Sequence, residues 1–338
     1  MLFSADLQSP LLTAFRHAPT FVRADLLVPD DYLDSPEKRY PVIYWVHAFG
    51  GDYRRQFSAW QDALHREDAE FIVVSLDAAL GTGHHEFADS ANNGPWGEAL
   101  VHEFIPELER RFHMLATART RFVSGHSSGG WSSLWLQVNY PDTFGGVWSI
   151  APDPIDFHDF TGPDLLRSPP QNFYRDPAGH DYGFVRRRGY DTETLREYVT
   201  SDDRRPPPRQ QFGSFDAVFS PRGEGGAPER LFDHRSGTID PVVEKYWDAN
   251  YDIARLVTAR WPELGPKLRG KVHVFVGTED TFHLDGSVRA FQQDLKPLGD
   301  DFDIVYVPGA DHFTVFDYDH GLIRHIVREM KQALELRR

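Results

Sequence analysis

The stretch that decides the fold is 121–131, which reads RFVSGHSSGGW. An apolar run leads into Gly125-His126-Ser127-Ser128-Gly129, and a segment that permits a helix, 131–136, follows it. This is the pattern G-x-S-x-G in the setting that it needs, a strand followed by a sharp turn and a helix. The pattern predicts that Ser127 is a nucleophile placed at the turn. The same five residues also occur by chance in loops rich in Ser and Gly.

The predicted turn has a physical cost, which its glycines reduce. A strand that passes directly into a helix holds the turn residue in a strained conformation, and Gly125 and Gly129 lack the Cβ atoms that would collide there. The Ser127 hydroxyl would stand above the sheet at a helix N-terminus, where free N–H groups favour negative charge. The rest of the chain must then provide a base, an orienting acid and an oxyanion hole.

Two later strands end in residues that can serve as acid and base. The predicted strand 271–276 is followed by Gly277-Thr278-Glu279-Asp280, and the predicted strand 303–307 by Pro308-Gly309-Ala310-Asp311-His312. Reactive groups of open α/β sheets lie beyond the carboxyl ends of strands. The chain order Ser, acid, His is the order that a nucleophile of this kind requires.

These positions predict the catalytic roles. A serine hydroxyl is a poor nucleophile, so His312 would take its proton, and Asp280 would hold the imidazole in the correct tautomer. Glu279 and Asp285 compete for the role of acid, and we favour Asp280 because it follows the strand at Gly-x-x-Asp spacing. Asp311 adjoins the histidine and is expected to point elsewhere.

The loop after the strand 40–47 is the expected oxyanion loop. We assign one N–H donor to Ser128 and the second to Phe49, with Ala48 as the alternative, because His47-Ala48-Phe49-Gly50-Gly51 ends a buried strand. Ala48 is also a candidate substrate-binding residue. Trp96 and Trp131 flank the predicted site and are candidate substrate contacts as well, although core packing explains Trp131 equally well.

The chain as a whole alternates between strand and helix patterns. Together these predict an α/β fold with a mostly parallel central sheet flanked by helices. Residues 1–20 show no clear period. We expect one domain over 1–338, with a long irregular insertion at 151–243 that is rich in Pro, Gly, Arg and Asp and is a possible lid. The predicted strands cover 21–29, 40–47, 71–76, the run from 121 into Ser127, 146–150, 271–276 and 303–307. The predicted helices cover 54–68, 98–112, a stretch after Ser127 that ends at 139, 244–258, 286–297 and a last one from 319.

Composition excludes several classes of function. The net charge of −15 is spread over the chain and would repel nucleic acid and anionic membranes, and no apolar run is long enough to span a bilayer. The absence of Cys excludes a thiol nucleophile and thiolate metal sites. The first residues, MLFSAD, do not resemble a signal peptide, so we expect a cytoplasmic protein or one whose leader has been removed. Oligomeric state is left open.

No cofactor or metal is expected. His84-His85-Glu86 with Glu98 and His102 match no strong ligand spacing, and Asp153, Asp156 and Asp159 lack the glycine and glutamate of an EF-type loop. We expect the last three to form a solvated acidic loop.

The motifs together resemble the esterase D-like family of α/β-hydrolases, which includes feruloyl and acetylxylan esterases, enterochelin esterases and mycolyltransferases. The resemblance covers roughly 21–150 and 244–330, and is carried by the loops 47–51, 93–97, 125–129, 277–280 and 309–312. Family members usually have His-Gly where this chain has His47-Ala48. The resemblance implies an α/β-hydrolase fold and no cofactor.

The expected function is therefore a serine carboxylic-ester hydrolase that forms an acyl-enzyme and acts on a small-molecule or carbohydrate ester, such as a feruloyl or acetyl ester. Two alternatives remain open. One is acyl transfer to a sugar or alcohol, and the other is a catalytically silent binding module on the same fold.

Overall fold

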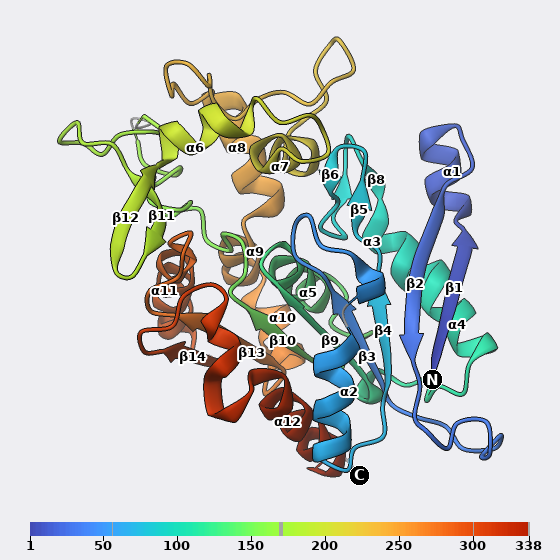
Figure 1. Cartoon of the computed structure of the whole chain (residues 1–338). Coiled ribbons are helices and arrows are strands. Elements are labelled where there is room, and N and C mark those ends of the chain that lie inside the picture. The colour runs from blue at the N-terminus through green and yellow to red at the C-terminus, as the bar shows by residue number, and fades with distance from the viewer. Residues whose placement is uncertain (56, 169–171, 300, 337–338) are drawn as a thin grey trace.

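A central sheet of eight strands organises the computed structural model, which describes residues 1–55, 57–168, 172–299 and 301–336 (Figure 1). The strand order across the sheet is β1-β2-β4-β3-β9-β10-β13-β14. The strands are β1 (Leu2–Gln8), β2 (Phe21–Leu27), β3 (Val42–Val46), β4 (Ile72–Leu76), β9 (Arg121–His126), β10 (Gly146–Ile150), β13 (Val272–Gly277) and β14 (Asp303–Val307).

The six strands from β4 to β14 run parallel, and β2 and β1 continue the sheet antiparallel at one edge. Every residue of β3, β4 and β10 is buried. Such runs lack polar alternation because helices cover both faces of a parallel sheet. The predicted α/β class with a mostly parallel sheet is confirmed.

Helices cover both faces of the sheet. On one face, α2 (Phe57–Arg66) packs against α12 (Leu322–Leu336), and on the other α5 (Ser128–Asn139) contacts β9, β10, α9 (Ile253–Ala259) and α10 (Trp261–Leu268) (Figure 1). The helix α11 (Leu284–Leu295) also contacts α9 and β13. In the described part of the chain, no helix combines the length and the apolar character that crossing a bilayer needs.

The segment 151–243, which the sequence predicts to be irregular, contains regular structure. It forms a hairpin of β11 (Gly183–Arg187) and β12 (Tyr190–Thr194), then α6 (Leu195–Asp202) and α7 (Gln211–Phe219), and leads into α8 (Pro241–Tyr251). Figure 1 shows α6, α7 and α8 beyond the end of the sheet toward which β4 points. The buried rings of this segment belong to the same core as the sheet, and include Phe157, Phe160, Phe173, Phe212, Phe215, Phe219 and Phe232.

Outside the segment 151–243, several elements differ from the sequence expectation. The first twenty residues form β1 and α1 (Pro10–Arg16), although they show no period, because only Ala5 of the edge strand β1 is buried. The predicted helix 98–112 consists of α3 (Trp96–Ala99), a π-helical segment at Leu100–Phe104 and α4 (Ile105–Arg111). The helix α10 was not predicted because Pro262, Gly265 and Pro266 read as helix breakers.

Candidate active site

Ser127 lies at a sharp turn between β9 and α5, as the sequence predicts. Its backbone has φ 58° and ψ −122°, a conformation that is strained for any residue with a Cβ. A Cβ on Gly125 would lie 2.1 Å from the carbonyl oxygen of Gly129, and one on Gly129 would lie 2.1 Å from that of Val46. Only glycine therefore fits on either side of the serine, and this holds the nucleophile candidate above the end of the sheet.

His312 and Asp280 meet beyond the carboxyl ends of the neighbouring strands β13 and β14. Nδ1 of His312 lies 2.8 Å from Oδ2 of Asp280, and both side chains are buried. The other oxygen of Asp280 accepts the N–H of Phe282 at 2.8 Å and that of Leu284 at 3.3 Å. Both oxygens of the Asp280 carboxylate thus have hydrogen-bond partners. Because Nδ1 of His312 is paired with this carboxylate, Nε2 is the ring nitrogen that remains able to exchange a proton.

The competing acidic residues face other partners. Glu279 and Asp285 each lie 3.8 Å from Nη1 of Arg186, which comes from β11 of the inserted segment. Asp311 accepts the N–H groups of Phe313 and Thr314 at 2.9 and 2.7 Å. Asp280 is therefore the carboxylate that contacts His312, and Asp311 points away as expected.

The Ser127 hydroxyl has a partner that the sequence analysis did not assign. It donates to Oδ1 of Asp153 at 3.4 Å, and the neighbouring Ser128 hydroxyl donates to Oδ2 at 2.5 Å. Asp153 lies three residues beyond the end of β10. Asp280 and His312 were predicted because they are polar residues just beyond parallel strands, and the same rule could have identified Asp153.

A second buried carboxyl lies behind the first. Oε2 of Glu86 accepts the Ser132 hydroxyl at 2.9 Å, and burial raises the pKa of Glu86 well above its usual range. The pKa of Asp153 is raised to about 7, chiefly by burial and also by the nearby Glu86 carboxyl, although the hydrogen bond from the Ser128 hydroxyl opposes the increase. The cause is the cost of an ionised carboxylate in a poorly hydrated site. The nucleophile candidate therefore stands next to a carboxyl that titrates near neutrality.

The expected oxyanion loop forms a tight turn at the end of β3. The N–H of Gly51 donates to the carbonyl of Ala48 at 2.9 Å, and Gly50 has φ 69°, so Phe49 lies at the centre of the turn. Ser128 begins α5, where the first N–H groups of a helix have no acceptor within the helix. Both predicted donors thus belong to turns that flank Ser127 and the end of β3.

Buried histidines support this loop. Nε2 of His84 lies 3.0 Å from the carbonyl oxygen of His47, and Nε2 of His47 accepts the N–H of Ala78 at 3.0 Å. Burial lowers the pKa of His47 and that of His84 to about 4, and for His47 the His84 ring adds to the effect. These rings are therefore neutral and act as hydrogen-bonding supports.

The two candidate tryptophans are packed in the core. Trp131 is fully buried and stacks on Trp135 with ring centroids 5.0 Å apart. Trp96 stacks on His85 at 3.9 Å, and its indole N–H donates to the carbonyl of Asn93. Neither ring lines the two cavities that reach Ser127. The rings of Trp96 and Trp131, predicted as substrate contacts, therefore pack in the core away from both cavities.

Two cavities open on Ser127. The larger, about 420 Å³, also reaches His312 and is bordered by Ala48 and Phe49. The smaller, about 40 Å³, is bordered by Asp153 and shares Ser127, Tyr198, Gln211 and Phe282 with the larger one. Residues of the inserted segment line the smaller cavity, among them Thr161, Phe184, Tyr198, Gln211 and Phe215.

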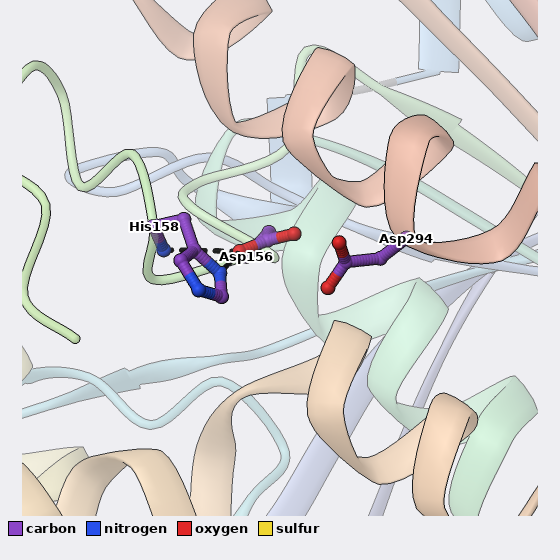
Figure 2. A group of neighbouring side chains, drawn as sticks. All are labelled: Asp156, His158 and Asp294. Atoms are coloured by element: carbon purple, nitrogen blue, oxygen red, sulfur yellow. Dashed lines mark hydrogen bonds and ion pairs between the residues drawn. The ribbon is translucent and has the colours of Figure 1, made fainter. Parts of the chain in front are cut away.

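The acidic residues after β10 do not form the solvated loop that the sequence suggested. Asp153 contacts the two serines, Asp156 is fully buried, and Asp159 accepts the N–H of Gly162 at 2.7 Å. Figure 2 shows the Asp156 carboxylate between His158, which it hydrogen-bonds at 2.9 Å, and Asp294 of α11. The Ser287 hydroxyl oxygen accepts the backbone N–H groups of Ile155 and Asp156, and the Asp156 carboxylate accepts that of His158. These hydrogen bonds satisfy polar groups of the segment and so allow it to be buried.

The side chains of the histidine-rich segment around residue 85 likewise do not converge on one point as metal ligands would. His84 and His85 contact the backbone carbonyls of His47 and Asp77, whereas His102 pairs with Glu98 at 3.3 Å on an exposed helix surface.

Known structures share this fold over nearly the whole chain. A ferulic acid esterase superposes with a TM-score of 0.62 at 14% identity, covering 99% of this chain and 98% of that one. An S-formylglutathione hydrolase from Staphylococcus aureus gives 0.58 at 12% identity, covering 99% and 98%. A ferulic acid esterase from Anaeromyces mucronatus, solved with ferulic acid, gives 0.51 at 15% identity, covering 100% and 92%.

The fold is an α/β-hydrolase fold, with Ser127 at the turn between β9 and α5. The model of the family described as Putative esterase matches residues 20–312, and the chain belongs to that family. It is a serine carboxylic-ester hydrolase.

Proposed function

We propose that Ser127, His312 and Asp280 form the catalytic triad of this esterase. The observation that carries the proposal is the 2.8 Å contact between Asp280 and His312. His312 and Ser127 line the same cavity. Ser127 hydrogen-bonds Asp153 in the resting state, so its hydroxyl must rotate toward Nε2 of His312 when the ester binds. Catalytic hydrogen bonds often tighten only in the substrate complex.

The reaction has two halves. Oγ of Ser127 attacks the carbonyl carbon as Nε2 of His312 takes the hydroxyl proton, and the bond to the leaving alcohol then breaks as that oxygen receives the proton. A water then repeats the sequence on the acyl-enzyme and returns the serine. Asp280 stabilises the imidazolium in both halves. The N–H groups of Ser128 and Phe49 would bind the oxyanion of each tetrahedral intermediate.

The two cavities suggest which part of the ester lies where. The alcohol must lie near His312, which protonates it, so the larger cavity would take the alcohol part and the smaller cavity the acyl group. A volume of about 40 Å³ is that of a few water molecules and suits a short acyl group such as acetyl. A feruloyl group is much larger and would enter only if the inserted segment 151–243 moved. In that case the segment would act as a lid.

The test is hydrolysis of p-nitrophenyl acetate and labelling by a fluorophosphonate. We expect the wild type to release nitrophenol and to be labelled at Ser127, and p-nitrophenyl butyrate and a feruloyl ester to be poorer substrates. Absence of both hydrolysis and labelling would favour the binding module. Diversion of the acyl group to an added alcohol in preference to water would favour the acyltransferase.

A further inference from the structure

A buried carboxylate is an unusual wall for a cavity that would hold an acyl group. Asp153 is only 6% exposed, and it shares the smaller cavity with the rings of Phe184, Tyr198 and Phe215. An acetyl or propionyl group offers this carboxylate no hydrogen bond. An apolar residue of similar size would serve a purely apolar acyl group better, because burying an unpaired polar group is costly.

In the proposed mechanism, Asp153 loses one of its two hydrogen-bond partners during the reaction. Its Oδ2 is held by the Ser128 hydroxyl at 2.5 Å, whereas the described partner of Oδ1 is the Ser127 hydroxyl, at the long distance of 3.4 Å. When Ser127 turns to His312 and attacks, Oδ1 loses that contact. A buried acceptor without a donor is unfavourable, so something else must supply one at that moment.

The acyl group itself is in position to supply the donor. In the acyl-enzyme, a substituent on the carbon next to the carbonyl is three bonds from Oγ of Ser127, and Oδ1 of Asp153 is 3.4 Å from that Oγ in the resting state. Such a substituent can therefore lie within hydrogen-bonding reach of Oδ1 inside the smaller cavity. An amino or hydroxyl group there would pair with the carboxylate, and the aromatic walls also suit an ammonium group.

We propose that this site prefers short acyl groups that carry a hydrogen-bond donor, a hydroxyl or an ammonium, on the carbon next to the carbonyl, and that Asp153 accepts that hydrogen bond. The inference rests on the proposed esterase function and gives the substrate class of the same site. Asp153 then acts as a specificity residue, and its contact with Ser128 keeps it in place.

The preference is tested with three phenyl esters whose acyl groups have nearly the same size: glycolate, glycinate and propionate. Of their CH₂OH, CH₂NH₃⁺ and CH₂CH₃ groups, the first two carry a hydrogen-bond donor, the second also carries a positive charge, and the third carries neither. Each kcat/KM is divided by the rate of hydroxide-catalysed hydrolysis, which removes differences in intrinsic reactivity. We expect the wild type to prefer the glycolate, the glycinate or both over the propionate by roughly ten- to a hundredfold. Which of the two is preferred identifies the donor.

Variants of Asp153 distinguish a role in substrate specificity from a purely structural role. Asp153→Ala removes the acceptor and should bring the ratio of donor-bearing ester to propionate close to one. Asp153→Asn keeps a neutral acceptor and should abolish a preference for glycinate while retaining part of one for glycolate. Asp216→Asn is the matched control, because Asp216 is also buried with its pKa raised to about 7 by burial, yet it accepts the N–H of Leu231 away from Ser127. It should leave the ratios unchanged.

The outcomes are distinct. A wild type that hydrolyses propionate as well as both donor-bearing esters would overturn the inference while leaving the esterase proposal intact. Equal losses on all three esters in both Asp153 variants would also overturn it, because a structural role alone lowers every rate together. No hydrolysis of any ester by the wild type would overturn the proposed function, and the inference with it.

Discussion

Nδ1 of His312 lies 2.8 Å from Oδ2 of Asp280, although 32 positions separate the two residues in the chain. The adjacent parallel strands β13 and β14 bring them together, because each strand ends directly before one of the two loops. Burial of both side chains keeps this contact from competing with water. The pair is the part of the site on which the proposed mechanism most depends.

Replacement of the proposed nucleophile should stop turnover without unfolding the protein. Ser127→Ala removes the attacking oxygen, and we expect kcat for p-nitrophenyl acetate to fall by roughly 10⁴-fold or more. His312→Ala should have a similar effect, and the double variant should be little worse than either single one. Circular dichroism and the urea midpoint check that folding is retained. Substantial activity in Ser127→Ala would exclude the assignment.

The acid can be identified by three conservative substitutions. Asp280→Asn keeps the size of the side chain but removes the charge that stabilises the imidazolium, so kcat should fall by roughly 10³–10⁴-fold. Glu279→Gln and Asp311→Asn should change kcat less than about tenfold, because Glu279 faces Arg186 and Asp311 accepts backbone N–H groups. A larger loss in Glu279→Gln than in Asp280→Asn would reverse the assignment.

The glycine after the elbow should tolerate no side chain. In Gly129→Ala the new Cβ would meet the carbonyl of Val46, whose backbone belongs to a central strand and cannot easily move. We expect the free energy of unfolding in urea to fall by about 2–3 kcal/mol or more, with loss of activity. Gly81→Ala is the control, since nothing lies within 4 Å of the added Cβ there. Equal stability of the two variants would contradict the packing described here.

Low pH should weaken the hydrogen bonds that support the proposed oxyanion loop. Burial lowers the pKa of His47 and of His84 to about 4, so the folded protein holds both rings neutral while the unfolded chain takes up protons near the ordinary histidine pKa of about 6.5. The stability due to the neutral rings is therefore complete above pH 6.5 and is lost as the pH falls toward 4. Each ring accounts for a loss on the order of 3 kcal/mol over this window.

Urea unfolding at pH 7 and pH 4.5 measures this effect. His84→Asn should reduce the loss of stability between the two pH values, and His65→Asn, at an exposed position on α2, should not. An unchanged pH dependence in His84→Asn would show that the ring is not a source of the acid sensitivity.

Much of the fold and of the triad candidates could be read from the chain, because both depend on local patterns. Strands buried on both faces are continuous apolar runs, and β10 and β14 begin and end where the pattern predicts. The tryptophans show the limit of such reading. Trp131 stands one turn into α5, and only packing decides that its ring faces Trp135 and the core.

The sequence by itself determined the turn at Ser127, the order of the candidate nucleophile, acid and histidine, and the α/β class, since each follows from residue types at fixed spacing along strands and turns. The tertiary structure alone decided which carboxylate contacts His312, that Asp153 stands against Ser127, and that residues of 151–243 wall the smaller cavity. These facts depend on contacts between distant segments. Burial, which raises the pKa of Asp153 to about 7, exists only once those segments have packed together.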